Sequence, residues 1–136
     1  MVTSSLLEAE KRLLGLISQS KKLYKMSSAQ IKAEEFATNV YRRLAKSMYD
    51  SYENGMSPDP AMMLNDFSGD DLSEASEVFY NLEVYSGDEE TVKELLYTIK
   101  LEKLNMRINA EADPTNLMDL FKQREELLNE KNTWEE

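Results

Sequence analysis

Apolar residues recur at three- and four-residue intervals along almost the whole chain, and this period limits the possible folds more than any other feature. It is the period of an α-helix with one buried face. The 136 residues include only four Gly and three Pro, so few positions interrupt regular structure. A chain of this length can bury one compact core. The sequence therefore predicts an all-α protein.

Three stretches of this pattern fill the first part of the chain, and Ser4 or Ser5 is the expected N-cap of the first. Their apolar positions are Leu6, Ala9, Leu13, Leu14 and Ile17, then Leu23, Tyr24 and Met26, then Phe36, Val40, Tyr41, Leu44, Met48 and Tyr52. Asn54-Gly55 ends the third stretch, because Gly adopts the left-handed conformation of a helix end at little cost. The rings of Tyr41, Tyr49 and Tyr52 are expected in the core with their hydroxyls in water.

A corner follows, because Pro58 and Pro60 cannot continue a helix but fit the first turn of the next one. Asp59 suits the positive end of that helix. Met62 and Met63 are interpreted as core fillers of a short helix. The helical pattern resumes over residues 72–82, and Ser86-Gly87-Asp88 is expected to break it again.

The last third of the chain predicts a long helix whose buried face changes halfway along its length. Asp113-Pro114 marks a turn, after which a second helix runs back. The successive apolar positions are Val92, Leu95, Leu96 and Ile99, then Leu101, Leu104 and Ile108, then Leu117, Leu120, Phe121, Leu127 and Leu128. We expect an N-terminal helical bundle over residues 1–88, followed over residues 89–136 by a long helix and a C-terminal helical hairpin.

The chain contains no Cys and no His, which argues against an enzyme and against a cofactor. Without them there is no thiolate chemistry and no imidazole base or metal ligand. Asp66, Ser68, Asp70 and Glu77 have part of the spacing of a calcium loop, but Asp71 stands where that loop needs Gly. We interpret these acids as the N-terminal turn of a helix, with no metal site and no catalytic residue.

Charge is unevenly distributed along the chain. Residues 1–49 hold nine Lys and Arg against four Asp and Glu, whereas residues 50–90 hold twelve Asp and Glu and no Lys or Arg. With a net charge of −10, the chain is a poor candidate for binding nucleic acid directly. The asymmetry fits either solvated helix faces or a polarised surface that orients a protein partner. A possible patch for an acidic peptide consists of Lys21, Lys22, Lys25, Arg42 and Arg43.

No apolar stretch is long enough to span a membrane, and charges interrupt the start of the chain within eight residues. A cytoplasmic protein without membrane contact is therefore expected. The hairpin carries more apolar residues than a two-helix contact needs, so it either folds back on the bundle or presents a binding face. The expected partner-binding residues are Leu104, Ile108, Leu117, Leu120, Phe121, Arg124, Leu127 and Leu128.

The stretches "EAEKRLLGLI", "IKAEEFATNVYRRLAKSMYDSYENG" and "PDPAMMLNDF" resemble the C-terminal helicase-binding domain of bacterial DnaG-type primases. The resemblance implies a bundle joined by a long helix to a hairpin that docks on the N-terminal domains of the hexameric replicative helicase, and so couples priming to unwinding. It also implies that the chain lacks the primase's own catalysis, and it makes the acidic tail of single-strand-binding protein a further candidate partner.

Two alternatives to the primase interpretation stay open. The N-terminal domain of the replicative helicase itself opens with a similar pattern, although the continuation into a hairpin favours the primase. A free-standing helical adaptor or regulator would have the same periodicity.

Overall fold

The computed structural model describes residues 2–80 and 88–134 and confirms the all-α prediction. Within these residues there are seven α-helices, one short 3-10 helix and no strand. In chain order they are α1 (Ser4–Ile17), α2 (Lys21–Ser28), η1 (Ala33–Glu35), α3 (Asn39–Glu53), α4 (Pro60–Leu64), α5 (Gly69–Tyr80), α6 (Glu89–Ala110) and α7 (Pro114–Thr133). In the part of the chain that is described, no helix is long and apolar enough to cross a membrane.

Helix α1 is the centre of the bundle. Leu13, Leu14 and Ile17 are fully buried, and the helix packs against α2, α3, α5 and α6. Its N-cap is Thr3, whose Oγ1 accepts from the amide of Leu6, so the expected cap at Ser4 or Ser5 is wrong. The same hydroxyl donates to Oε2 of Glu102 over 2.9 Å and ties the start of α1 to α6.

The predicted corner after α3 is confirmed, since α3 ends at Glu53 and Gly55 has a φ of 72°. Asp59 caps α4 by accepting from the amide of Ala61, and Pro60 is in the first turn. Pro58 precedes the helix instead of lying in its first turn. Phe36 is buried as expected, but it follows η1 and lies outside α3.

The hydroxyls of Tyr49 and Tyr52 on α3 were expected in water, but both form hydrogen bonds inside the protein. Tyr49 donates to the carbonyl of Ile31 over 2.9 Å, and Tyr52 donates to the carbonyl of Ile17 over 2.5 Å. Both hydroxyls are therefore paired inside the protein and do not point into water. They fix α3 to the ends of its neighbours.

Met62 and Met63 differ in their burial. Met63 is buried, as expected, but the side chain of Met62 is 69% exposed and is not a core filler. The predicted resumption of the helix is confirmed by α5, while Leu82 and the predicted break at Ser86-Gly87 lie outside the described residues. Asp88 is the N-cap of α6.

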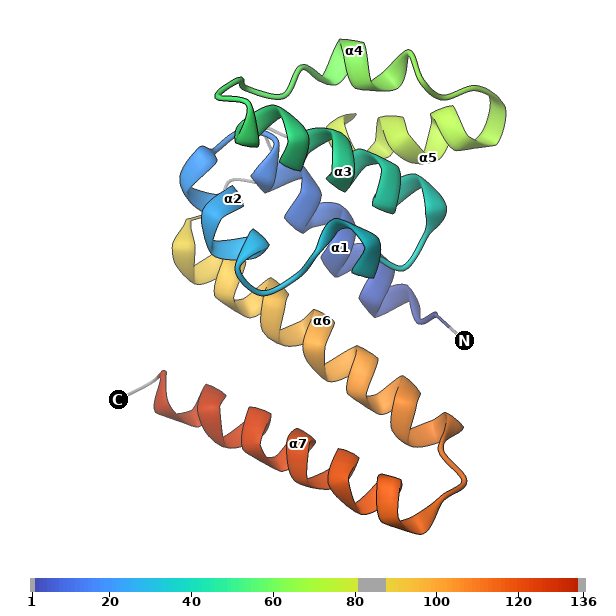
Figure 1. Ribbon diagram of the computed structural model, residues 1–136, viewed down its shortest axis with the longest axis vertical. Coiled ribbons are helices and arrows are strands. Elements are labelled where there is room, and N and C mark those ends of the chain that lie inside the picture. The colour runs from blue at the N-terminus through green and yellow to red at the C-terminus, as the bar shows by residue number, and fades with distance from the viewer. Residues whose placement is uncertain (1, 81–87, 135–136) are drawn as a thin grey trace.

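Helix α6 belongs to both parts of the molecule. Its first half places Val92, Leu95, Leu96 and Ile99 in the main core. Its second half continues beyond the bundle, and α7 runs back along it after the turn at Asp113-Pro114 (Figure 1). In the same view α4 and α5 form the layer at the opposite end of the molecule.

Candidate functional site

The hairpin of α6 and α7 contains all eight residues predicted to bind a partner, but only some of them face outward. Leu120 is 4% exposed and Leu127 is also buried. Since α7 packs on α6, both side chains lie inside the hairpin. Leu104, Ile108, Leu117 and Arg124 are half-buried. Leu120 and Leu127 therefore hold the hairpin together and have no surface to offer a partner.

The outward side of α7 carries Phe121 and Leu128, each 42% exposed, together with Met118, which is 72% exposed. These positions are separated by three and seven residues, so they lie on one face of the helix. Lys122 and Glu125 fall on the same face by the same spacing. We call Met118, Phe121 and Leu128 the α7 stripe. Met118 was missing from the predicted site, although its spacing to Phe121 could have indicated it.

Arg124 connects the two helices beneath this stripe. Its Nη1 donates to Oδ1 of Asn105 on α6 over 2.9 Å. Its guanidinium carbon lies 5.1 Å from the centroid of the Phe121 ring. Arg124 thus orients Phe121 and holds α7 in register with α6.

The open end of the hairpin is closed by aromatic contacts. Trp134 meets Tyr97 of α6 edge to face, with 5.9 Å between ring centroids, and the ammonium of Lys131 lies 4.4 Å from the Tyr97 centroid. These contacts join the last turn of α7 to the part of α6 that enters the bundle.

A groove of about 370 Å³ runs along one flank of the hairpin. Lys100, Lys103 and Arg107 form the α6 wall, whereas Glu126 and Glu130 stand on the α7 wall. Leu104 and Leu127 contribute its apolar lining. The groove can therefore contact a segment that carries both signs of charge.

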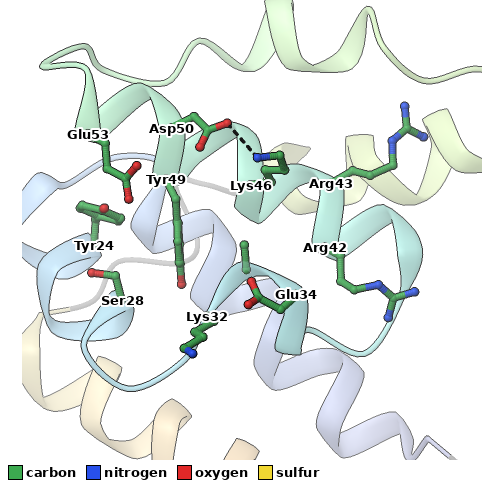
Figure 2. A pocket seen from close by; sticks show the side chains of 11 residues that line it. Tyr24, Ser28, Lys32, Glu34, Arg42, Arg43, Lys46, Tyr49, Asp50 and Glu53 are labelled. Carbon is green, nitrogen blue, oxygen red and sulfur yellow. Dashed lines mark hydrogen bonds and ion pairs between the residues drawn. The ribbon is translucent and has the colours of Figure 1, made fainter.

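A second hollow, of about 520 Å³, lies between α2, η1 and α3. Figure 2 shows Tyr24 and Ser28 at one end and Arg42 and Arg43 at the other. Both arginines already have partners, since Arg42 donates to the carbonyl of Phe36 and Arg43 donates to that of Asp66. The guanidinium of Arg43 also covers the Phe67 ring at 4.3 Å.

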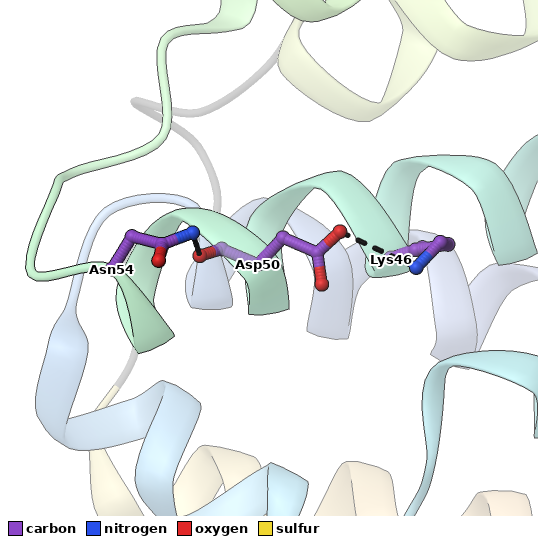
Figure 3. Close-up of polar contacts among 3 residues, drawn as sticks. All are labelled: Lys46, Asp50 and Asn54. Carbon is purple, nitrogen blue, oxygen red and sulfur yellow. Dashed lines mark hydrogen bonds and ion pairs between the residues drawn. The ribbon is translucent and has the colours of Figure 1, made fainter.

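A row of polar contacts runs along α3 (Figure 3), and two of its members, Lys46 and Asp50, line this hollow. The ammonium of Lys46 pairs with Asp50 over 3.3 Å, and Asn54 Nδ2 donates to the Asp50 carbonyl over 2.8 Å. The pair is exposed, so it adds little stability but neutralises charge beside the hollow.

The three lysines predicted to join the arginines are on α2 and do not line the hollow that the arginines line. Lys22 forms an ion pair with Glu89 at the start of α6, and Lys21 lines a different, smaller hollow. Lys25 is exposed. The structure thus brings Arg42 and Arg43 together but separates them from Lys21, Lys22 and Lys25. Binding of an acidic peptide stays a prediction.

Sequence reasoning missed the buried carboxylate of Glu10. The residue is fully buried in α1, its Oε1 accepts from the amide of Ala37 over 2.8 Å, and its Oε2 has no hydrogen-bond partner. Burial raises the pKa of Glu10, while the Ala37 hydrogen bond and the charges of Lys103 and Arg42 act in the opposite direction. Its position in the sequence could have predicted this burial, because residue 10 falls on the same helix face as Leu6, Leu13 and Leu14.

The acidic run after Phe67 forms the first turn of α5, as interpreted from the sequence. Asp70 and Asp71 stand at the positive end of that helix. Over residues 2–80 and 88–134, no three carboxylate side chains come close enough together to hold a metal ion.

Comparison with known proteins corrects the proposed family. The family model of the DnaB-like helicase N terminal domain matches residues 2–103, three quarters of the chain. No curated protein and no solved structure matches. The identification as a primase C-terminal domain is therefore wrong, and so is the function of recruiting helicase on behalf of primase.

The physical reason for the error lies in the motifs that suggested it. In "EAEKRLLGLI" the residues Ala9, Leu13, Leu14 and Ile17 are buried. They specify how the bundle packs and carry no information about its partner. The hairpin that favoured the primase has its second helix outside the matched residues. The family is that of a non-catalytic domain in DNA replication, and the chain belongs to the DnaB-like helicase N-terminal domain family.

Proposed function

We propose that this chain is a protein-binding domain of the replicative helicase type, and that its hairpin docks a primase. Two observations support the proposal: the family match and the α7 stripe. The proposal concerns binding only. It assigns no reaction to the described residues.

The α7 stripe is the observation that carries the docking surface. Helix α7 packs on α6 with Leu120 and Leu127, so its opposite side is left without a partner in the described chain. Three large apolar side chains on one helix face form a suitable contact for an amphipathic helix. Lys122 and Glu125 on that face would add polar contacts at the edge of the interface.

Arg124 gives this surface rigidity. Because its guanidinium bonds Asn105 and covers the ring of Phe121, the ring is oriented before a partner arrives. A preoriented aromatic side chain loses little conformational entropy on binding. Phe121 is therefore the expected centre of the interface.

Calorimetric titration with the primase of the same organism tests this proposal. Phe121→Ala and Leu128→Ala are each expected to weaken binding about tenfold or more, as truncation of a central apolar contact does. Met56→Ala is the matched control, because Met56 is an exposed apolar residue in the connection between α3 and α4, away from the hairpin.

The possible results separate two errors. If primase binds and both hairpin variants bind as tightly as the native chain, the hairpin is the wrong surface. If the native chain does not bind primase at all, the partner is wrong. Equal weakening by Met56→Ala would also contradict a site on the hairpin.

A further inference from the structure

The outer layer formed by α4 and α5 exposes large apolar side chains that the hairpin proposal does not use. Met62 is 69% exposed, Tyr80 is 83% exposed and Leu72 is also exposed. This layer lies at the end of the molecule opposite α7 (Figure 1). We call the exposed sides of these two helices, which carry Met62 on α4 and Leu72, Tyr80 and four carboxylates on α5, the α4–α5 face.

These side chains are exposed because of how the two helices pack. Helix α4 buries only Met63, and α5 buries Ala75 and Val78. On α5 the positions opposite Ala75 and Val78 are 70, 73, 77 and 80, which places Glu77 and Tyr80 on the outward side. The two helices pack against each other, and α5 also packs against α1 and α3, so nothing else in the described chain covers this layer.

The charge of this face has one sign. The sequence contains no Lys or Arg between Lys46 and Lys93. Helix α5 alone carries Asp70, Asp71, Glu74 and Glu77, and no ion pair to any of the four is found in the described residues. The nearby cation Arg43 donates to the backbone carbonyl of Asp66 and not to a carboxylate.

The negative field of these acids reaches into the protein. Burial raises the pKa of the Tyr41 hydroxyl, and the charges of Glu74 and Glu77 raise it further. A surface with this potential repels phosphates, which excludes nucleic acids and anionic membranes as natural occupants. It attracts cationic groups, and the flexible Met62 side chain can adapt to an apolar contact.

We propose that the α4–α5 face docks a basic amphipathic segment of a protein partner. Its apolar side chains would contact Met62, Leu72 and Tyr80, and its Lys or Arg side chains would lie opposite Glu77 and its neighbours. A twelve-residue helix such as α5 is about 18 Å long, so α4 and α5 together fit within the footprint of one ordinary interface. This surface is separate from the hairpin.

Fluorescence anisotropy with a labelled Leu/Lys peptide of amphipathic helical pattern, titrated with the intact protein, tests the proposal. A peptide of the same composition in scrambled order is the control for charge alone. The patterned peptide is expected to bind at least about tenfold more tightly than the scrambled one. Its affinity is expected to fall as salt is raised, because salt screens the carboxylates.

Two site variants and two matched controls locate the binding. Met62→Ser and Glu77→Lys are each expected to weaken binding about fivefold or more. The controls Val2→Ser and Glu94→Lys change an exposed apolar residue and an exposed acid away from the α4–α5 face. They are expected to leave the peptide affinity within about twofold of the native value. Circular dichroism checks that all four variants fold.

Three results would overturn the proposal. The first is equal binding of the patterned and scrambled peptides, which would mean attraction by net charge alone. The second is equal weakening by the site variants and the controls. The third is no binding of the patterned peptide at concentrations up to about 1 mM, beyond the range of a weak specific complex.

Discussion

Glu10 is the residue whose environment departs most from what the sequence suggests. Its carboxylate is enclosed in the bundle, where one oxygen accepts from Ala37 and the other has no hydrogen-bond partner. Lys103 donates to the carbonyl of Glu35 over 2.5 Å, and Arg42 donates to that of Phe36 over 3.0 Å. Glu10, Arg42 and Lys103 thus hold the connection between α2 and α3 from three helices.

Glu10→Gln is predicted to change how stability depends on pH. Because burial raises the pKa of Glu10 in the folded state above its ordinary value of 4.5, the folded chain binds that proton more tightly than the unfolded chain. The Glu10 contribution to stability is therefore full below the unfolded pKa and is lost as pH rises through the folded pKa. The glutamine keeps an acceptor for Ala37 but does not titrate.

Urea unfolding of both chains between about pH 4 and about pH 8 checks this prediction. The free energy of unfolding of Glu10→Gln relative to the native chain should rise with pH across that window. Its total change should be roughly 1.4 kcal/mol for each unit by which the pKa is raised. A difference that stays constant with pH would mean that Glu10 titrates in the fold as it does in water.

At the scale of the elements, sequence periodicity located the helices well but did not show which side of each one is covered. Asn54-Gly55, Asp59-Pro60 and Asp113-Pro114 marked helix ends because Gly, Pro and Asp act locally. Leu120 and Phe121 are adjacent apolar residues, and only the packing of α7 on α6 makes the first internal and the second exposed. Met62 is exposed and Met63 is buried for the same reason.

This difference predicts opposite effects for two adjacent substitutions. Leu120→Ala is expected to destabilise α7 by about 2 kcal/mol or more, because it removes a buried contact within the hairpin. Phe121→Ser is expected to lower stability by about 1 kcal/mol or less, because the main contact it removes is the partly exposed one with the Arg124 guanidinium. Hydrogen exchange of the α7 amides measures both.

Helix α1 provides the internal reference for this experiment. Leu120 is not part of the main core cluster, so Leu120→Ala should speed exchange in α7 and leave exchange in α1 unchanged. If exchange in α1 speeds up equally, α7 and the bundle unfold as one cooperative unit, and the hairpin does not unfold separately.

At the scale of the whole molecule, the predicted boundary at residue 88 separates elements that share one core. Val92, Leu95, Leu96 and Ile99 of α6 belong to the same buried cluster as Leu13 and Leu44. A chain ending at residue 88 is therefore expected to lose its cooperative thermal transition. A chain ending at residue 110 lacks only the hairpin's second helix and is expected to keep its cooperative thermal transition.

Thermal melts of the two truncated chains, followed by circular dichroism, make this comparison. A cooperative melt of residues 1–88 would show that the first half of α6 is dispensable for the bundle. That result would contradict the role assigned to its four buried side chains.

The family and the partner lie beyond what the residues of the bundle could predict. Core residues such as Leu13 and Leu14 specify how the bundle packs and do not identify its family, so the sequence led to the right fold and the wrong family. The candidate site was predictable in part, because surplus apolar residues pointed to the hairpin. Which of them face outward depended on helix packing.

The most direct test of the central claim is hydrogen–deuterium exchange of the intact chain with and without the primase of the same organism. The proposal predicts slower exchange on binding over α7 and the second half of α6, with no change over α4 and α5. Protection confined to α1, α3 or α5, at concentrations where the complex forms, would contradict docking at the hairpin.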